Sequence, residues 1–255
     1  MPTRAACLLL CLSLLPATGP ATATDSAESL RFAIRWLFVP AGTAVLQQQP
    51  LADDRIRFRA ETCSNRTIDL FYKVRDRITA DGRREAQGYR AERYDFHLRE
   101  GRHKADQVAD FTTPGKVRFH DLQKNTEETF DIPVGTVDVL TAFFVTRELP
   151  LEVGREYRIP VFDKRKSYDV VVEVLRRESR DTILGRVDTV VIRPRMETEG
   201  IFKRTGDIYI WLTDDERHIP VYMESEVKIG RVIAELVERA DSVPAGNSGR
   251  LACES

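Results

Sequence analysis

The sequence has little cysteine and no excess of charge of either sign. Only four of its 255 residues are cysteine, and 39 Lys and Arg residues oppose 40 Asp and Glu residues, for a net charge of −1. Because nucleic-acid binding needs a clustered basic excess, this balance argues against nucleic acid as a partner. Charges alternate in sign along the chain, as in residues 176–181 (RRESRD), which is typical of a solvated surface.

The sequence also lacks the common motifs of catalysis and cofactor binding. It contains no GxGxxG fingerprint, no P-loop and no GxSxG elbow. Its four histidines do not show the i,i+2 or i,i+4 spacing of metal ligands, and His97 and His103 are six residues apart across a predicted turn. Asp214 and Asp215 are explained by the turn that they occupy. We therefore predict no catalytic residue, no metal site and no cofactor, and a protein that is not an enzyme.

Long apolar runs are absent except at the N-terminus. Residues 5–15 (AACLLLCLSLL) follow Arg4 and precede the helix breakers Pro16 and Gly19. This run is about half of the roughly 20 residues that cross a bilayer as a helix. Small residues then occupy 21–23 (ATA), as a signal peptidase requires. The pattern predicts a signal peptide over residues 1–23, cleavage between Ala23 and Thr24, a periplasmic location, and no transmembrane segment in the mature chain.

Removal of the leader changes the charge and the cysteine content. The leader holds one basic and no acidic residue, so 38 basic and 40 acidic residues remain, for a net charge of −2. Only Cys63 and Cys253 remain, and an oxidising compartment permits a bridge between them. Cys253, however, lies in residues 240–255 (ADSVPAGNSGRLACES), whose composition predicts a disordered tail. Composition thus slightly favours unpaired thiols, and a bridge stays open.

Short alternating runs bounded by turn residues dominate the rest of the chain, which predicts antiparallel strands. Turns are expected at Pro40–Thr43, Asp81–Gly82, Glu100–Gly101, Pro114–Gly115 and Thr213–Glu216. Pro220 lacks a backbone donor and should sit at a bulge or an edge. The expected strands are 30–39, 44–46, 55–60, 67–78, 89–98, 103–111, 157–163, 167–176, 182–193, 202–212 and the second half of 208–223.

One segment changes to a helical period. In residues 137–149 (VDVLTAFFVTREL) apolar side chains fall on one stripe, Asp138 or Thr136 can cap the start, and Pro150 ends the run. Residues 228–239 (KIGRVIAELVER) are compatible with a helix or a strand, and the surrounding pattern favours a strand. We predict a single mainly β domain over 24–239: a curved antiparallel sheet or half-open barrel with one short helix on its concave face.

Aromatic residues suggest a binding surface on that concave face. A curved sheet partly closed by a helix can shelter an apolar ligand such as a lipid. The alternative is that the same residues form the core. The six candidates are Trp36, Phe38, Phe143, Phe144, Tyr209 and Trp211.

The chain resembles the domain of unknown function 3108 family, which comprises exported bacterial envelope proteins. The likeness covers residues 30–238 and rests on the order and spacing of several segments: IRWLFVPAGTAVL (34–46), FYKVRDRI (71–78), HLREG (97–101), IPVGTVDVLTAFFVTRELPLEVG (132–154), VFDKRKSYDVVVEVLRRE (161–178) and EGIFKRTGDIYIWLTDDERHIPVYMESEVKIG (199–230). The resemblance implies a β-rich envelope protein and supplies no catalytic residue. It draws attention to six polar positions whose role it does not define: Arg75, Arg99, Glu100, Asp163, Tyr168 and Asp215.

These observations lead to three functional hypotheses. The first is a non-enzymatic periplasmic binder or carrier of an apolar, lipid-like ligand. The second is an envelope interaction protein that binds another protein through exposed strand edges or its charged face. The third is a hydrolase, which would need a carboxylate and a histidine to converge, such as Glu100 and His97. Whether the space between helix and sheet is filled or open distinguishes the first hypothesis from the others.

Overall fold

A computed structural model describes residues 26–86, 88–198, 201–202, 207–227 and 230–243. The predicted signal peptide and most of the predicted tail lie outside these ranges, so those two predictions stay untested. Ala240 is an exception, because it ends the last strand instead of belonging to a disordered tail.

The described chain forms one open antiparallel sheet in the order β8-β7-β6-β5-β4-β3-β2-β1-β15-β14-β13-β11-β10-β9, with β12 paired to β11. Most neighbours in space are also neighbours in sequence, which is the signature of hairpins. The elements are β1 (Glu28–Trp36), β2 (Val39–Pro50), β3 (Arg55–Ser64), α1 (Arg66–Asp69), β4 (Arg75–Arg84), β5 (Tyr89–Glu100), β6 (His103–Asp110), β7 (Lys116–Asp121), β8 (Thr126–Asp131), α2 (Val139–Arg147), β9 (Glu156–Asp163), β10 (Lys166–Thr182), β11 (Gly185–Thr198), β12 (Ile201–Phe202), β13 (Ile208–Thr213), β14 (Pro220–Glu226) and β15 (Arg231–Ala240).

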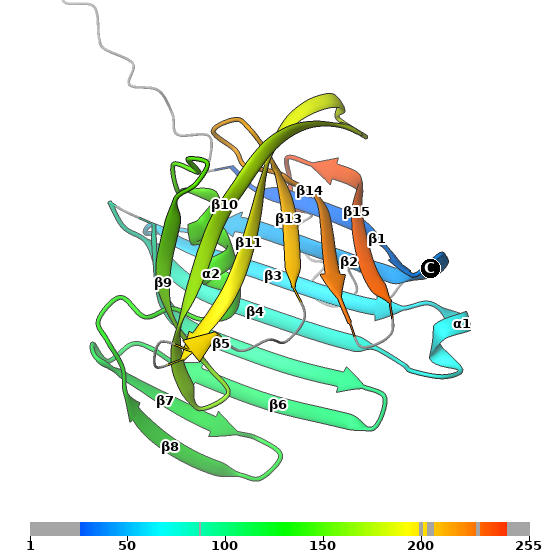
Figure 1. Cartoon of the computed structure of the whole chain (residues 1–255). Coiled ribbons are helices and arrows are strands. Elements are labelled where there is room, and N and C mark those ends of the chain that lie inside the picture. Colours follow the sequence, from blue (N-terminus) through cyan, green and yellow to red (C-terminus); the bar gives the residue numbers. More distant parts are fainter. Residues whose placement is uncertain (1–25, 87, 199–200, 203–206, 228–229, 244–255) are drawn as a thin grey trace, which may run out of the picture.

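The sheet curves around α2, and the predicted fold class is confirmed. Figure 1 shows α2 on the concave side of the sheet, and the helix contacts β3, β4, β5 and β9. Asp138 caps the helix as predicted, because its side chain accepts a hydrogen bond from the backbone N–H of Thr141 at 2.8 Å.

The space between helix and sheet is occupied by aromatic rings. Phe144 of α2 stacks on Phe58 of β3 with ring centroids 3.9 Å apart, and both side chains are fully buried. Burying a side chain of this size stabilises the fold by about 1.5–3 kcal/mol. The helix is therefore held to the sheet by direct packing.

Side chains close the gap between the two edge strands, β8 and β9. The ring centroids of Phe162 on β9 and Phe130 on β8 are 5.4 Å apart, and the guanidinium of Arg165 lies 2.7 Å from the carboxylate of Glu128. The segment 132–138, which we call the strap, runs from β8 to α2. In the strap, Val137 adds a short parallel bridge to β9 at Val161. The edge of β9 is thus partly covered without closure of the backbone ladder.

Two predicted turns are wrong. The first hairpin turns at Leu37 and Phe38, and β2 already begins at Val39 and runs through Pro40–Thr43. Asp81 and Gly82 lie inside β4, where the pairing with β5 shifts register. Gly82 is needed there because a Cβ would lie 2.6 Å from the carbonyl oxygen of Arg90. Close strand approach, not a turn, explains this glycine.

Two predicted strands are interrupted in the structure, and the predicted strands 44–46 and 167–176 are parts of the longer strands β2 and β10. Residues 67–78 are not one strand, because Asn65 caps the short helix α1 and β4 begins only at Arg75. Residues 202–212 divide into β12 and β13. In contrast, the last segment is a strand as favoured, and the register of the β13–β14 hairpin shifts at Pro220 as expected.

Cys63 takes part in a disulfide. The expectation of an unpaired thiol is therefore wrong for this residue. The other cysteines of the sequence lie outside the described residues, so the structure does not describe the partner.

Candidate functional site

Two of the six predicted ligand-binding aromatics lie on α2. Phe144 is buried against Phe58, and Phe143 is half-buried at its side with the two rings 5.7 Å apart. Their contacts are those of a hydrophobic core, which is the alternative that the sequence left open. Ligand binding by these residues remains an untested prediction.

Tyr209 and Trp211 lie together on β13, away from the α2 side chains. Trp211 is buried and belongs to a second hydrophobic cluster with Phe32 of β1. Its indole N–H donates to Glu178, and the guanidinium of Arg180 lies 4.9 Å from its ring centroid. Arg180 also lies 3.8 Å from the ring centroid of Tyr222, so cation–π stacking covers this cluster.

Trp36 and Phe38 do not line the concave face. Trp36 ends β1, and Phe38 lies in the β1–β2 turn, where it is 95% exposed. The prediction placed them there because it continued the alternation of β1 past Trp36, whereas the chain turns at Leu37. The six aromatics are therefore divided among three places.

Three of the six polar positions have structural roles. Arg75 pairs with Asp69 at 2.7 Å and donates to the carbonyl oxygen of Ser64. Arg99 makes two bonds to Asp106, at 2.8 and 2.9 Å. Asp215 accepts hydrogen bonds from Thr213 and from the backbone of Arg217 and His218, which shapes the β13–β14 turn.

The other three positions are carboxyl or phenol groups with perturbed acidity. Burial raises the pKa of Glu100, and the neighbouring carboxyl of Asp76 raises it further. Burial also raises the pKa of Asp163 and of Tyr168. Glu100 and His97 lie on the same strand, but the side chain of His97 is bound to Asp106 at 2.8 Å.

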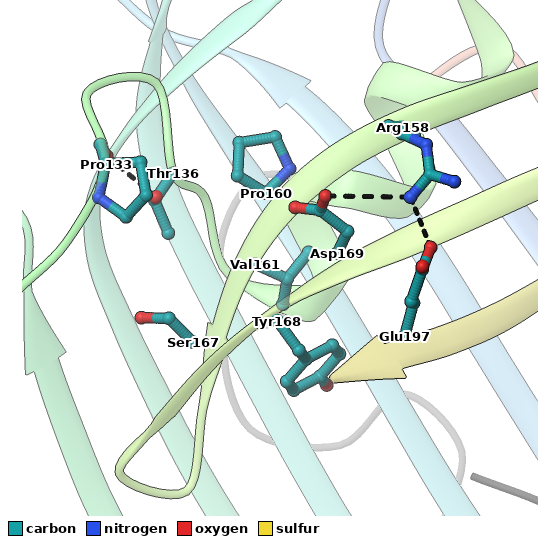
Figure 2. Close-up of a pocket in the computed structure, with 9 residues that line it drawn as sticks. All are labelled: Pro133, Thr136, Arg158, Pro160, Val161, Ser167, Tyr168, Asp169 and Glu197. Atoms are coloured by element: carbon teal, nitrogen blue, oxygen red, sulfur yellow. Dashed lines mark hydrogen bonds and ion pairs between the residues drawn. The ribbon is translucent and has the colours of Figure 1, made fainter. Parts of the chain in front are cut away.

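Tyr168 contributes to a pocket on β9 and β10 beside the strap (Figure 2). The pocket has a volume of about 350 Å³. Arg158 is bound to Glu197 and lies 3.9 Å from Asp169, so its charge is already balanced by two carboxylates. The wall mixes apolar, hydroxyl and charged side chains: Pro133, Thr136, Arg158, Pro160, Val161, Ser167, Tyr168, Asp169 and Glu197.

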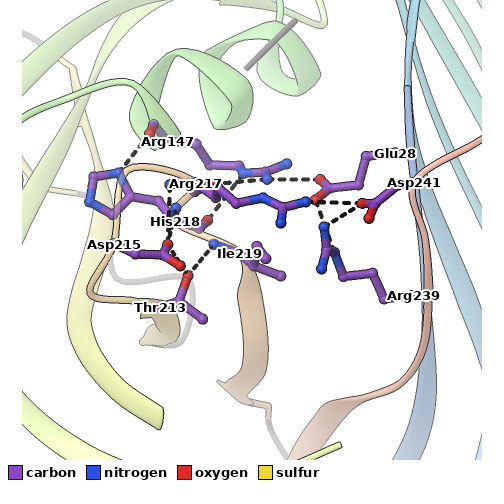
Figure 3. Close-up of polar contacts among 9 residues, drawn as sticks. All are labelled: Glu28, Arg147, Thr213, Asp215, Arg217, His218, Ile219, Arg239 and Asp241. Atoms are coloured by element: carbon purple, nitrogen blue, oxygen red, sulfur yellow. Dashed lines mark hydrogen bonds and ion pairs between the residues drawn. The ribbon is translucent and has the colours of Figure 1, made fainter. Parts of the chain in front are cut away.

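A buried ion pair that the sequence did not reveal ties α2 to β1. Arg147, at the last position of α2, meets Glu28 at 2.8 Å, and both side chains are more than nine-tenths buried. Arg147 also donates to the carbonyl oxygens of Arg217 and His218 in the β13–β14 turn (Figure 3). A basic residue near a helix C-terminus was recognisable, but Glu28 is far away in sequence and gave no signal.

The same end of the sheet carries other paired charges, and we call it the polar end. Arg84 of β4 pairs with Glu148 at 3.0 Å, and Arg239 of β15 lies 3.7 Å from Glu28. The β2–β3 turn at this end exposes Asp53 and Asp54.

The opposite ends of these strands carry exposed apolar side chains, which we call the hydrophobic end. Its residues are Trp36, Leu37, Phe38 and Val39 at the β1–β2 turn and Leu70, Phe71 and Tyr72 of the loop after α1. Phe71 is 83% exposed and Leu70 is 79% exposed. The two segments are joined because the backbone N–H of Asn65, just before α1, donates to the carbonyl oxygen of Ala41 at 2.9 Å. Figure 1 shows α1 and the β1–β2 turn at the same end.

Neither a membrane-spanning helix nor a metal cluster is found within the described ranges. No helix there has the length and apolar composition to cross a bilayer. No three His, Cys, Asp or Glu side chains of those ranges are grouped as metal ligands would be.

Comparison with known proteins gives a family and a fold. The model of a family described as "Protein of unknown function (DUF3108)" matches residues 31–237. A solved structure described as a beta-barrel-like protein of domain of unknown function DUF1849, from Brucella abortus, is similar with a TM-score of 0.59 and 11% sequence identity. The similarity covers 84% of this chain and 97% of that chain, and at this identity it shows the fold alone. No curated protein matches the sequence.

Proposed function

The chain belongs to the DUF3108 family of proteins of unknown function, and we propose that it acts in the bacterial envelope as a non-enzymatic interaction protein that docks through its hydrophobic end. The proposed location follows from the leader-like residues 1–23. The hydrophobic end would then be the surface through which the mature chain binds its partner.

The observation that carries this proposal is the exposure of the apolar side chains at the hydrophobic end. Folded proteins rarely expose contiguous apolar side chains of this size without a binding role. Phe38, Leu70 and Phe71 are 95%, 79% and 83% exposed, whereas other phenylalanines and leucines of the chain are buried in its cores. Their exposure does not contribute to folding, and it supports contact with a partner.

The packed interior makes a lipid carrier less attractive. A carrier needs an apolar cavity, whereas the concave face beneath α2 is occupied by the Phe58 and Phe144 rings. Docking through strand edges is also less favoured. Val137 covers part of β9, and Glu127, Glu128 and Asp131 lie on the exposed edge strand β8, where charges oppose pairing with another strand.

Fractionation of cells that produce the protein tests the proposal. Most of the wild-type protein should sediment with the envelope and begin near Thr24, whereas the F38S/F71S variant should move to the soluble periplasmic fraction. V134S is the matched control, since Val134 is 84% exposed but lies in the strap. Equal distribution of the three proteins, or an uncleaved protein in the cytoplasm, would refute the proposal.

The pocket on β9 and β10 beside the strap supports a second candidate function, the binding of a small ligand. Its mixed wall and its volume of about 350 Å³ suit a small amphipathic molecule better than a lipid chain. Native mass spectrometry of protein purified from the periplasm should then find a bound small molecule that Ser167→Trp displaces. A protein that is always empty would exclude this candidate.

A further inference from the structure

We propose that the hydrophobic end docks on a lipid bilayer with anionic head groups. This inference rests on the proposed function and names the partner of the same surface. A membrane surface is the occupant that the shape, the residue types and the charges of this end favour together.

The shape is that of projecting turns. The backbone N–H of Leu37 donates to the carbonyl oxygen of Arg231 at 2.9 Å, and the N–H of Gly101 donates to that of Lys73 at 2.8 Å. With the Asn65–Ala41 bond, these contacts tie the β1–β2 turn to the start of β15, the residue before α1 to β2, and the β5–β6 turn to the loop after α1. Turns that project from a fixed base can enter the interfacial layer of a bilayer.

The residue types are those of membrane interfaces. Trp36 and Tyr72 are amphipathic aromatics, which favour the level of the lipid head groups. Phe38, Leu70 and Phe71 are more exposed than these two and would reach further into the bilayer. The three most exposed side chains of the hydrophobic end are therefore purely apolar, and its two amphipathic aromatics are less exposed.

Leu37 indicates that the apolar character of the first turn is not a by-product of folding. Its backbone has φ = 55°, the left-handed region that glycine and asparagine adopt more easily than leucine. A polar turn residue would relieve that strain. A leucine that remains 43% exposed at this position gains little from the core, so binding is the better explanation.

Three basic side chains lie on the α1 side of the hydrophobic end, near Tyr72, where the partly buried carboxyls of Glu100 and Asp76 also lie. Arg66 lies on α1, Lys73 follows Tyr72, and Arg102 lies in the β5–β6 turn beside Tyr72. All three are exposed, and within the described ranges none of them is paired with an acidic side chain. The neighbouring Asp69 is neutralised by Arg75 at 2.7 Å. Unpaired cations beside exposed apolar side chains complement anionic lipid head groups.

Binding of the exported form to protein-free vesicles tests the proposal. Vesicles of phosphatidylethanolamine and phosphatidylglycerol should bind the protein in sedimentation assays, and vesicles without the anionic lipid should bind it at least tenfold more weakly. F38S/F71S should weaken binding to the anionic vesicles by more than tenfold. K73E/R102E should weaken it at least tenfold at low salt and less at high salt. V134S and R186E, at exposed sites elsewhere, should bind as the wild type does.

Intrinsic fluorescence supplies a second measurement, which can be made on the wild-type protein and on a variant of a surface residue. The chain has two tryptophans, and Trp211 is buried under arginine side chains. Anionic vesicles should shift the emission of the wild-type protein to shorter wavelength, and the W36F variant should show no shift. A shift that persists in W36F would overturn the proposed mode of docking.

The two proposals fail in different ways. If no vesicle binds the protein, or if neutral vesicles bind it equally well, the lipid proposal is overturned. The same holds if F38S/F71S merely dissociates a homodimer while vesicles remain unbound. Retention of the wild-type protein in the envelope fraction, sensitive to F38S/F71S, would in those cases still support the interaction function with a protein partner.

Discussion

The two ends of strands β1–β5 differ in the exposure and the pairing of their side chains. At the polar end, charged side chains face one another, as Arg147 and Glu28 do with both side chains buried. At the hydrophobic end, apolar side chains face solvent, and three basic side chains, Arg66, Lys73 and Arg102, have no ion pair within the described residues. One end therefore pairs its buried charges, whereas the other exposes apolar side chains, which is the basis of the proposed docking.

The comparison predicts that substitutions at one end alter stability without altering binding, and that substitutions at the other end do the reverse. Changes at the polar end should lower the free energy of unfolding without altering the surface that docks. Changes at the hydrophobic end should abolish docking and leave the free energy of unfolding almost unchanged. Each prediction below tests one part of this separation.

The largest effect is expected for Arg147→Met. The substitution leaves Glu28 buried without its closest partner and removes the donor to two carbonyl oxygens, which should lower the free energy of unfolding by about 3–5 kcal/mol. Urea denaturation measures the loss. The control is R186M, because Arg186 pairs with Asp181 at the surface, and it should change stability by less than about 0.5 kcal/mol. Equal midpoints for the two variants would contradict a stabilising role of the polar end.

Asp138 sharpens the comparison, because within the described ranges this buried carboxyl has no basic partner. Burial raises its pKa to about 6, above the value of about 3.9 in an unfolded chain. The folded state therefore binds more protons between pH 4 and 6, and the contribution of Asp138 to stability falls by about 3 kcal/mol as pH rises through this window.

Asp138→Asn keeps a capping oxygen and removes the titration. The difference in unfolding free energy between the wild type and D138N should favour the wild type more at pH 4 than at pH 7. Urea denaturation of both proteins across this range provides the measurement. Parallel stability curves would show that Asp138 does not titrate in this way.

A smaller effect of opposite sign is expected for Leu37→Asn. Asparagine adopts the left-handed backbone of this turn more easily, while the contact of the Leu37 side chain with Gly230 is lost. The net result should be a gain of up to about 1 kcal/mol in thermal or urea denaturation, together with weaker vesicle binding. A variant that loses stability would place Leu37 among the structural residues.

The smallest change in stability is expected for F38S/F71S. Both side chains are more than four-fifths exposed, so their removal should alter the free energy of unfolding by less than about 0.5 kcal/mol. The same variant should show the largest loss of vesicle binding. A large fall in the urea midpoint would mean that the hydrophobic end supports the fold, and the comparison between the two ends would break down.

The fold class was predictable because local patterns report on local structure. Alternation in residues such as Leu30 and Phe32 marks strands with one buried face, and the capped apolar segment from Asp138 onward marks a helix. Antiparallel hairpins place most sequence neighbours side by side, so a strand pattern and its turns already describe much of the sheet.

The wrong predictions concern residues whose local sequence pattern suggests one structure while contacts or a turn in the fold impose another. Asp81 and Gly82 are residue types common in turns. Gly82 is instead required because a Cβ there would clash with the backbone of Arg90 on β5. Phe38 continues the alternation of β1 but lies in the turn that it forms with Leu37, and leucine rarely takes the left-handed backbone found there. No local rule predicts that apolar residues such as Leu37 and Phe38 form a hairpin turn and stay exposed.

The amino-acid order is sufficient to specify a strand-rich chain with one capped helix, because propensity, capping and period act over a few residues. It does not specify which apolar residues become core and which stay exposed, because both kinds have the same composition. Folding buried Phe144 against Phe58 and left Phe38 in solvent. It also brought Glu28 to Arg147 across more than a hundred residues. Those contacts form only in the folded protein, where α2 packs on the concave side of the curved sheet.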